Sequence, residues 1–222
     1  MINDVMVFTP VYRLEPETVE AVFNLRWDGP ITWVFQRDNP TPLPTSPQGG
    51  EGPESDARAI GVKNHLHQYR RGRELFLRTA CDALLVIESD IIPPVDALER
   101  LAALDVDLAY GAYLFRVTPV VNIFERYQKK AINIGESLTV RGKWPWARQQ
   151  GVVECSGAGL GCVLIKRHVL EAVDFRITPL GRVHCDSLFT EDVYRKGFSM
   201  KADTAVLCGH KREDGEIIWP PS

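Results

Sequence analysis

The sequence predicts an α/β fold that opens with two parallel strands. Two apolar segments, Val5–Phe8 and Ile31–Phe35, have the length and the flanking residues of buried strands. Between them, Pro16 and Glu17 begin a segment with helical spacing of apolar residues, as is typical of a helix start. A strand, a helix and a second strand in this order imply a parallel pair. We expect a single domain, because no linker divides the 222 residues.

The rest of the chain continues to alternate between the two kinds of element. The Pro- and Gly-rich segment 41–56 is expected to be a flexible surface loop, because it cannot bury enough apolar area to order itself. Helices are expected over 57–80, 94–104, 166–173 and 186–196. Strands are expected over 84–87, 108–115, 162–165 and 204–209, with an irregular strand-like region over 120–153.

The composition is that of a folded protein without a disulfide framework or an overall basic charge. With 45% hydrophobic residues the chain can build a core, which excludes disorder throughout. The net charge of −3 carries no global basic signature, so a polyanionic partner would need a local patch. Five scattered cysteines do not suggest a disulfide framework, and we expect reduced thiols. Without a leader pattern or a long apolar run, the expected location is cytoplasmic.

The strand over 84–87 ends in the acidic motif Glu88-Ser89-Asp90. Glu88 and Asp90 point the same way, because side chains two apart in a strand share a face. Two such carboxylates repel each other unless a cation lies nearby, and hard oxygen ligands suit Mg²⁺ or Mn²⁺. The motif therefore predicts a divalent metal, and the alternative is an ordinary strand end with solvated acids.

Two later motifs each allow two interpretations. The segment Gly157–Gly161 precedes an apolar strand rather than a helix, which argues against a dinucleotide-binding loop. Its glycines allow either close approach of a ligand or a tight turn. His210 ends an apolar strand ahead of two cations, so it is either structural or placed where a metal meets a diphosphate.

A third motif is a group of acids near the start of the predicted helix over 186–196. Asp186, Glu191 and Asp192 either interact favourably with the positive end of the helix dipole or act on an acceptor hydroxyl. The residue types alone leave both interpretations open.

The order of these motifs resembles that of the GT-A glycosyltransferases, most closely short soluble members of the family 2 type. The matching pieces are Thr9-Pro10, Asp38, Glu88-Ser89-Asp90, Gly157–Gly161 ahead of Cys162–Arg167, Glu191-Asp192 and His210. The resemblance covers nearly the whole chain. It implies one GT-A-type domain with a mostly parallel central sheet flanked by helices and a small antiparallel part. The same resemblance implies a nucleotide-binding half over 1–115 and an acceptor-binding half over 116–222.

The resemblance also implies an activity, the transfer of a sugar from a nucleotide-diphosphate sugar to an acceptor hydroxyl. The first choice of donor is a UDP-sugar, and the cofactor is Mn²⁺ or Mg²⁺. Asp90 would bind the metal, His210 would be a further ligand, and Glu88 would lie nearer the ribose. Asp38 would contact the base or ribose.

The remaining roles that the resemblance implies concern the nucleotide and the acceptor. The residues that would contact the nucleotide are Thr9, Pro10, Arg13 and Ser89. Lys63 or Arg73 would neutralise the charge of the phosphate. Asp192 is the expected catalytic base of an inverting enzyme, while Glu191 and Asp186 would hold acceptor or sugar hydroxyls. Inverting and retaining stereochemistry both stay open.

Two alternatives remain at the level of the sequence. The default acceptor is a glycan precursor or a small hydroxyl compound. As the alternative, the acceptor could be a modified base in viral DNA, held by two basic clusters. These clusters are Arg70, Arg71, Arg73 and Arg78, and then Lys129, Lys130, Arg141, Lys143 and Arg148. The other alternative is a zinc-binding interaction module built from His184, Cys185, Cys208 and His210, although these lack the usual spacing of paired cysteines.

Overall fold

The computed structural model of the 222-residue chain describes residues 1–40, 54–115, 120–127, 139–178 and 184–221. The predicted loop over 41–56 falls mostly outside the described residues. Its last three residues are helical, because α2 (Glu54–Leu77) begins at Glu54. In the described part of the chain, no helix combines the length and the apolarity that crossing a bilayer requires.

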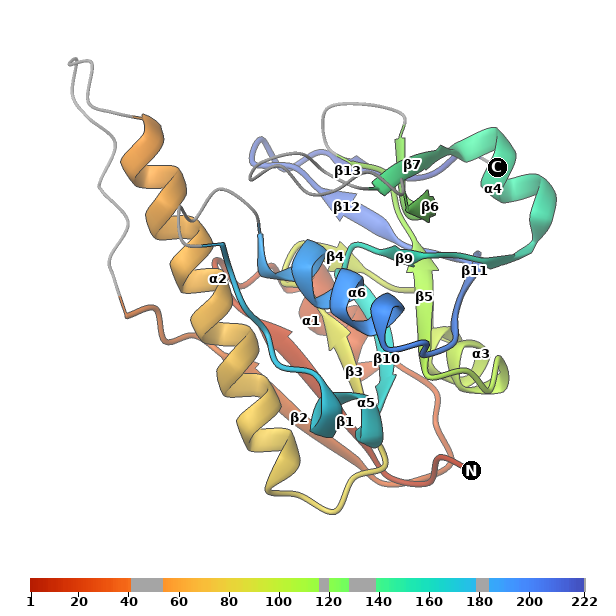
Figure 1. The fold of residues 1–222 in the computed structure, drawn as a ribbon, viewed down its shortest axis with the longest axis horizontal. Helices are drawn as coiled ribbons and strands as arrows, with labels where there is room; N and C mark the ends of the chain where they lie inside the picture. The colour runs from red at the N-terminus through yellow and green to blue at the C-terminus, as the bar shows by residue number, and fades with distance from the viewer. Residues whose placement is uncertain (41–53, 116–119, 128–138, 179–183, 222) are drawn as a thin grey trace.

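A seven-stranded sheet forms the centre of the molecule (Figure 1). Its strands, in spatial order, are β2 (Ile31–Gln36), β1 (Val5–Pro10), β3 (Ala83–Ile87), β10 (Cys162–Lys166), β5 (Leu108–Ala112), β11 (Met200–Leu207) and β8 (Val152–Glu154). All run in one direction except β10 and β8, which are antiparallel to their neighbours. The predicted α/β class with a mostly parallel central sheet is confirmed, and the arrangement is the one expected of a GT-A-type domain.

Two three-stranded antiparallel sheets lie beside the main sheet (Figure 1). One joins β13 (Ile217–Ile218), β12 (Gly209–Lys211) and β4 (Ile91–Ile92). The other joins β7 (Thr139–Lys143), β6 (Val120–Tyr127) and β9 (Gly157–Ala158). They form the small antiparallel part that was expected.

Helices cover both faces of the main sheet, and the alternation of side chains along β1 shows why. Met6 and Phe8 belong to a core cluster with residues of α2, α5 (Arg167–Ala172) and α6 (Cys185–Arg195). Val5 and Val7 point to the other face, into a cluster with α1 (Pro16–Phe23) and α3 (Ala97–Ala103). Each face therefore buries its own apolar row, and together the two clusters form the core.

Three elements differ from the sequence-based expectation. The predicted strand over 108–115 ends at Ala112, because the side chain of Asn122 accepts the N–H of Tyr113 and donates to the carbonyl of Gly111. The strand expected over 204–209 is divided between β11 and β12. Inside the strand-like region over 120–153, the structure has a helix, α4 (Trp144–Gln150), whose first turn tolerates proline.

Two glycines of α2 provide a matched test of its packing on the sheet. A Cβ at Gly72 would lie 2.6 Å from Cζ of Phe8, whereas a Cβ at Gly61 would meet no atom within 4 Å. Gly61→Ala should therefore stabilise the protein by about 0.5–1 kcal/mol through helix propensity. Gly72→Ala should instead destabilise it by about 1–3 kcal/mol through overpacking. Urea unfolding of both variants measures these changes, and equal effects would contradict the packing of α2 on Phe8.

Candidate active site

A cavity of about 500 Å³, called here the strand-end cavity, lies where the parallel strands of the main sheet end. Tyr12 follows β1, Asn39 follows β2, Glu88 to Asp90 follow β3, and Tyr113 follows β5. The carboxyl ends of strands in an open α/β sheet are where ligands bind. The location and volume of this cavity are those of a small-molecule site.

Three further elements complete the wall of the strand-end cavity. The start of α6 brings Asp186 and the residue before the helix, His184, while β12 brings His210. The helix α2 contributes Gly61, Asn64, His65 and Gln68. Spacings of three, four and seven residues place these four on one face of the helix.

Asp90 and His210 meet at the floor of this cavity although they are far apart in the sequence. Nε2 of His210 lies 3.5 Å from Oδ2 of Asp90. The backbone causes this proximity: His210 pairs with Ile91 between β12 and β4, and the N–H of Lys211 donates to the carbonyl of Asp90 at 2.8 Å. The side chain of His210 is only 10% exposed, so its ring is held by the surrounding packing.

The tautomer of the His210 ring is the one that suits a metal ligand bound through Nε2. Nδ1 lies 2.6 Å from the carbonyl oxygen of Leu114, and a carbonyl only accepts hydrogen bonds, so Nδ1 carries the hydrogen. This leaves Nε2 directed at the carboxylate of Asp90. Histidines that bind metals commonly donate their other N–H to a backbone carbonyl in this way. The pair therefore fits one side of a divalent cation.

Glu88, the first acid of the motif, is engaged differently. Its Oε1 accepts hydrogen bonds from Nε2 of His65 at 3.1 Å and from the hydroxyl of Tyr69 at 2.8 Å. Burial alone would raise the pKa of Glu88, but these hydrogen bonds outweigh it and lower the pKa. Of the metal ligands predicted from the sequence, Asp90 and His210 come together, while Glu88 is held by α2. Among the described residues, no three His, Cys, Asp or Glu side chains are grouped so that they could hold an ion by themselves.

His65 links this acid to helix α6. Its Nδ1 lies 3.8 Å from Sγ of Cys185, the first residue of α6. Burial opposes protonation of His65, but the contacts with Cys185 and Glu88 outweigh it and raise the pKa of His65 well above its usual range. Each of the two side chains keeps 25% of its surface exposed, so the contact between His65 and Glu88 lies at the edge of the cavity.

A second hydrogen-bonded group at the cavity joins α2 to the segments after β1 and β2. Nε2 of Gln68 donates to the carbonyl of Val11 at 3.0 Å and to Oδ1 of Asn39 at 2.8 Å. The amide of Asn39 therefore has its oxygen turned to Gln68. This arrangement connects α2 to the segments that follow β1 and β2.

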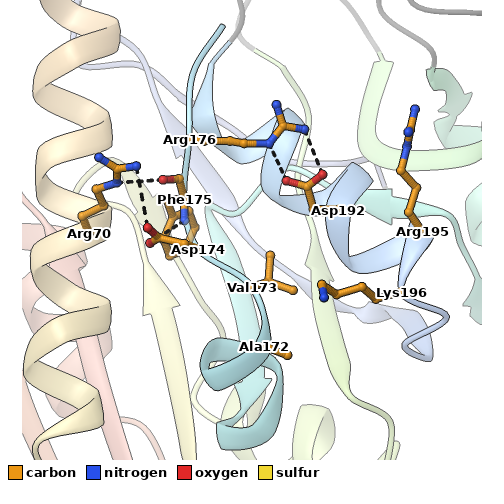
Figure 2. A pocket seen from close by; sticks show the side chains of 9 residues that line it. All are labelled: Arg70, Ala172, Val173, Asp174, Phe175, Arg176, Asp192, Arg195 and Lys196. Atoms are coloured by element: carbon orange, nitrogen blue, oxygen red, sulfur yellow. Dashed lines mark hydrogen bonds and ion pairs between the residues drawn. The ribbon is translucent and has the colours of Figure 1, made fainter.

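Asp192 lies in a different place from the acidic motif. It lines a second cavity of about 460 Å³, between α2 and α6, shown in Figure 2. There its two oxygens contact Nε and Nη2 of Arg176 at 2.6 and 2.8 Å. Glu191 is buried and pairs with Arg195 at 2.5 Å. The structure therefore brings Asp186 to the strand-end cavity, but neither of the other two acids.

Several residues predicted to contact the nucleotide lie outside the described lining of the strand-end cavity. Thr9 is buried within β1, whereas Asp38 and Lys63 are exposed. Arg13 pairs with Glu15 at 3.1 Å, and Arg73 donates to the carbonyls of Leu170 and Val173. Pro10, Ser89, Glu88, Asp90, Asp186 and His210 are the predicted residues that do line the cavity.

The glycine-rich segment accommodates protein side chains. Gly157 has φ of +140° and lies against Thr190 of α6, and a Cβ at Gly161 would lie 2.9 Å from the ring of Tyr113. In the described residues the groups that approach these glycines are the side chains of Thr190 and Tyr113, so the approach of a ligand stays a prediction. The segment thereby allows α6 to pack on β9.

The two alternatives from the sequence gain no support from the described residues. Arg71 and Arg78 pair with Glu74, while Arg70 and Arg73 contact Asp174 and nearby carbonyls. In the second basic cluster, Lys129 and Lys130 fall outside the described residues, as do the side chains of Arg141 and Lys143, and Arg148 is exposed. Cys208 is buried in the core beside Val206, so the four proposed zinc ligands do not converge.

The contribution of α2 to the site was not predicted from the sequence. His65, Gln68 and Tyr69 lie in the helix expected over 57–80, and the structure adds their contacts with the cavity residues. The recurrence of polar residues at Asn64, His65 and Gln68, with the small Gly61 one turn before them, is the available signal, because it marks a face without large apolar side chains.

Comparison with known proteins adds information on the fold. No family model and no curated protein sequence matches the chain. The chain is similar to the crystal structure of A197 from STIV, a viral protein, with 15% sequence identity, a TM-score of 0.56 and coverage of 99% of this chain and 95% of that one. It is also similar to S. aureus TarS 1–349 in complex with UDP, with 11% identity and a TM-score of 0.49, over 90% of this chain and 57% of that one. The first likeness supports the fold, and the second is too remote to add to it.

The ion pair between Arg176 and Asp192 can be tested by a double-mutant cycle. Because both side chains are partly exposed, we expect a coupling of about 0.5–1 kcal/mol between Arg176→Ala and Asp192→Ala in the free energy of unfolding. Chemical denaturation of the wild type, both single variants and the double variant measures it. Strict additivity would show that Asp192 is not engaged by Arg176 in solution.

Proposed function

We propose that this protein is a metal-dependent glycosyltransferase that moves a sugar from a nucleotide-diphosphate sugar to an acceptor hydroxyl. The observation that carries the proposal is the meeting of Asp90 and His210, from separate parts of the chain, at the floor of the strand-end cavity. A carboxylate and an imidazole in this arrangement fit a divalent cation, and the fold places them where α/β proteins bind ligands.

The two ends of the acidic motif would serve different parts of the donor. Asp90 and His210 would hold Mn²⁺ or Mg²⁺, and the nitrogen ligand favours Mn²⁺, because Mg²⁺ is bound through oxygens. A cation bound there would neutralise the negative charge that grows on the departing diphosphate. Glu88, whose carboxylate repels phosphate, would accept hydrogen bonds from hydroxyls. Tyr12 is 72% exposed and offers an aromatic face to the nucleobase.

Asp186 is our choice for the carboxylate that acts on the acceptor. It lines the strand-end cavity, whereas Asp192 contacts Arg176 through both oxygens in the second cavity. A general base must lie within hydrogen-bond reach of the proton that it removes. Asp186 would accept the proton of the acceptor hydroxyl as that oxygen attacks the sugar, which fits an inverting reaction. Asp192 would then stabilise the position of α6 through Arg176.

Removal of the metal or of its ligands tests the central proposal. Transfer or donor hydrolysis, measured with a panel of nucleotide sugars, should require Mn²⁺ or Mg²⁺ and should stop in EDTA. Asp90→Ala and His210→Ala should lower the rate at least about 100-fold, because charge on the leaving diphosphate loses its stabilisation. Asp28→Ala is the control, since Asp28 is exposed and precedes β2 at the opposite end of the sheet. Undiminished turnover in EDTA would refute the role of the metal.

The choice between Asp186 and Asp192 has its own test. Asp186→Asn should lower kcat by about 10²- to 10⁴-fold, the range for loss of a general base, with thermal stability retained. Asp192→Asn should alter kcat far less and should mainly lower stability. Steady-state kinetics and thermal unfolding of both variants separate these effects. If Asp192→Asn has the larger effect on kcat, the role of base returns to Asp192.

A further inference from the structure

The carboxylate of Glu88 uses one oxygen for the protein and presents the other to the cavity. Both of its side-chain hydrogen bonds, from His65 and Tyr69, end on Oε1. In the described part of the chain, no side-chain hydrogen bond ends on Oε2. The side chain lines the strand-end cavity and keeps 25% of its surface exposed. Since a carboxylate oxygen can only accept, Oε2 is suited to a ligand group that donates, such as a hydroxyl.

The two donors are rigidly held, and they come from one turn of α2. His65 and Tyr69 are four residues apart, so they share a face of the helix. The ring of Tyr69 is 1% exposed and lies 4.9 Å from the ring of Phe175 and 6.4 Å from that of Phe8. The ring of His65 packs against the edge of Tyr69 at 4.7 Å and contacts Cys185. Because core packing holds Tyr69, and the contacts with Tyr69 and Cys185 hold His65, the two donors orient the Glu88 carboxylate.

Without these donors the acid would turn away from the ligand. Glu88 follows the buried strand β3, and both it and Asp90 line the strand-end cavity. Its side chain has several rotatable bonds and an open cavity in front of it. Two hydrogen bonds to Oε1 favour the one rotamer in which that oxygen faces α2.

We infer that His65 and Tyr69 are positioning residues, which hold Glu88 so that Oε2 accepts a hydrogen bond from a ribose hydroxyl of the nucleotide. This inference rests on the proposed function, because the ligand is taken to be a nucleoside diphosphate. It adds a specificity to that function. The site prefers ribonucleotides over the deoxynucleotides that lack the bonded hydroxyl, and the preference originates in α2, not in the acidic motif alone.

The inference predicts that the preference for ribonucleotides over deoxynucleotides differs between the wild type and variants of His65 and Tyr69. Isothermal titration calorimetry in the presence of Mn²⁺ measures Kd for UDP, ADP, GDP and CDP, each beside its 2′-deoxy and 3′-deoxy form. For the nucleotide that binds, the wild type should bind the ribo form at least about tenfold more tightly than one deoxy form, as expected for a hydrogen bond to a charged group. Tyr69→Phe and His65→Ala should reduce this ratio towards one, mainly by weakening the ribo form.

The controls separate positioning from general loss of structure. Tyr69→Phe removes one oxygen from a buried ring, so the fold should be retained, which thermal unfolding verifies. His65→Gln keeps an amide N–H near the position of Nε2 and should restore part of the ratio. Two matched variants should leave it unchanged. These are Tyr110→Phe, which removes the hydroxyl of another buried tyrosine, and His168→Gln, which alters a second His–carboxylate pair at the surface. In turnover with the donor sugar, KM should rise while kcat changes little.

The outcomes distinguish the inference from the function on which it rests. If the wild type binds none of the four ribonucleoside diphosphates, the proposed function is overturned and this inference with it. If the wild type binds one of them but shows the same ratio as Tyr69→Phe and His65→Ala, the inference alone is overturned. A ratio lowered equally by Tyr110→Phe and Tyr69→Phe would also overturn it, because the effect would then be one of core packing.

Discussion

The short antiparallel pairing between β4 and β12 is the constraint on which the candidate site depends. It sets His210 opposite Ile91 and ties the N–H of Lys211 to the carbonyl of Asp90. Ahead of it, β11 has a register shift between Asp203 and Leu207, and the chain then passes into β12 at Gly209. A close fit around Gly209, where a Cβ would lie 2.8 Å from Ile217 and Trp219 atoms, holds β12 in place. Without this pairing, Asp90 would be a solvated acid at a strand end.

The two acids of the motif are each stabilised by a different part of the chain. Both carboxylates follow β3 on the same side, and each needs a positive or hydrogen-donating neighbour. Glu88 obtains donors from His65 and Tyr69 of α2, which lower its pKa. Asp90 lies beside His210 from the far end of the chain. Under the proposed function, the Asp90 end would face the cation and the diphosphate, and the Glu88 end would face hydroxyls of the nucleotide.

Helix geometry explains why the acids of α6 separate. Asp186 and Asp192 are six residues apart, which corresponds to about 9 Å along the axis and a rotation of about 240°. They therefore cannot act on one reacting group from a straight helix. Asp186 lies in the first turn at the strand-end cavity, and Asp192 reaches Arg176 (Figure 2). Helical periodicity alone predicts this separation, because positions six apart in a helix point in different directions.

The sequence by itself determined the class of the fold, its alternation of strands and helices, and the acidic motif, because these are local properties of apolar periodicity, turn residues and composition. It also indicated Asp90, His210 and Asp186, whose partners in the site it did not identify. The tertiary structure alone decided that β10 runs against its neighbours, that α2 supplies donors to Glu88, and that Arg73 and Asp192 serve packing and ion pairs away from the cavity. Such contacts join residues distant in sequence, and no local pattern records which of them the packing of helices on a sheet brings together.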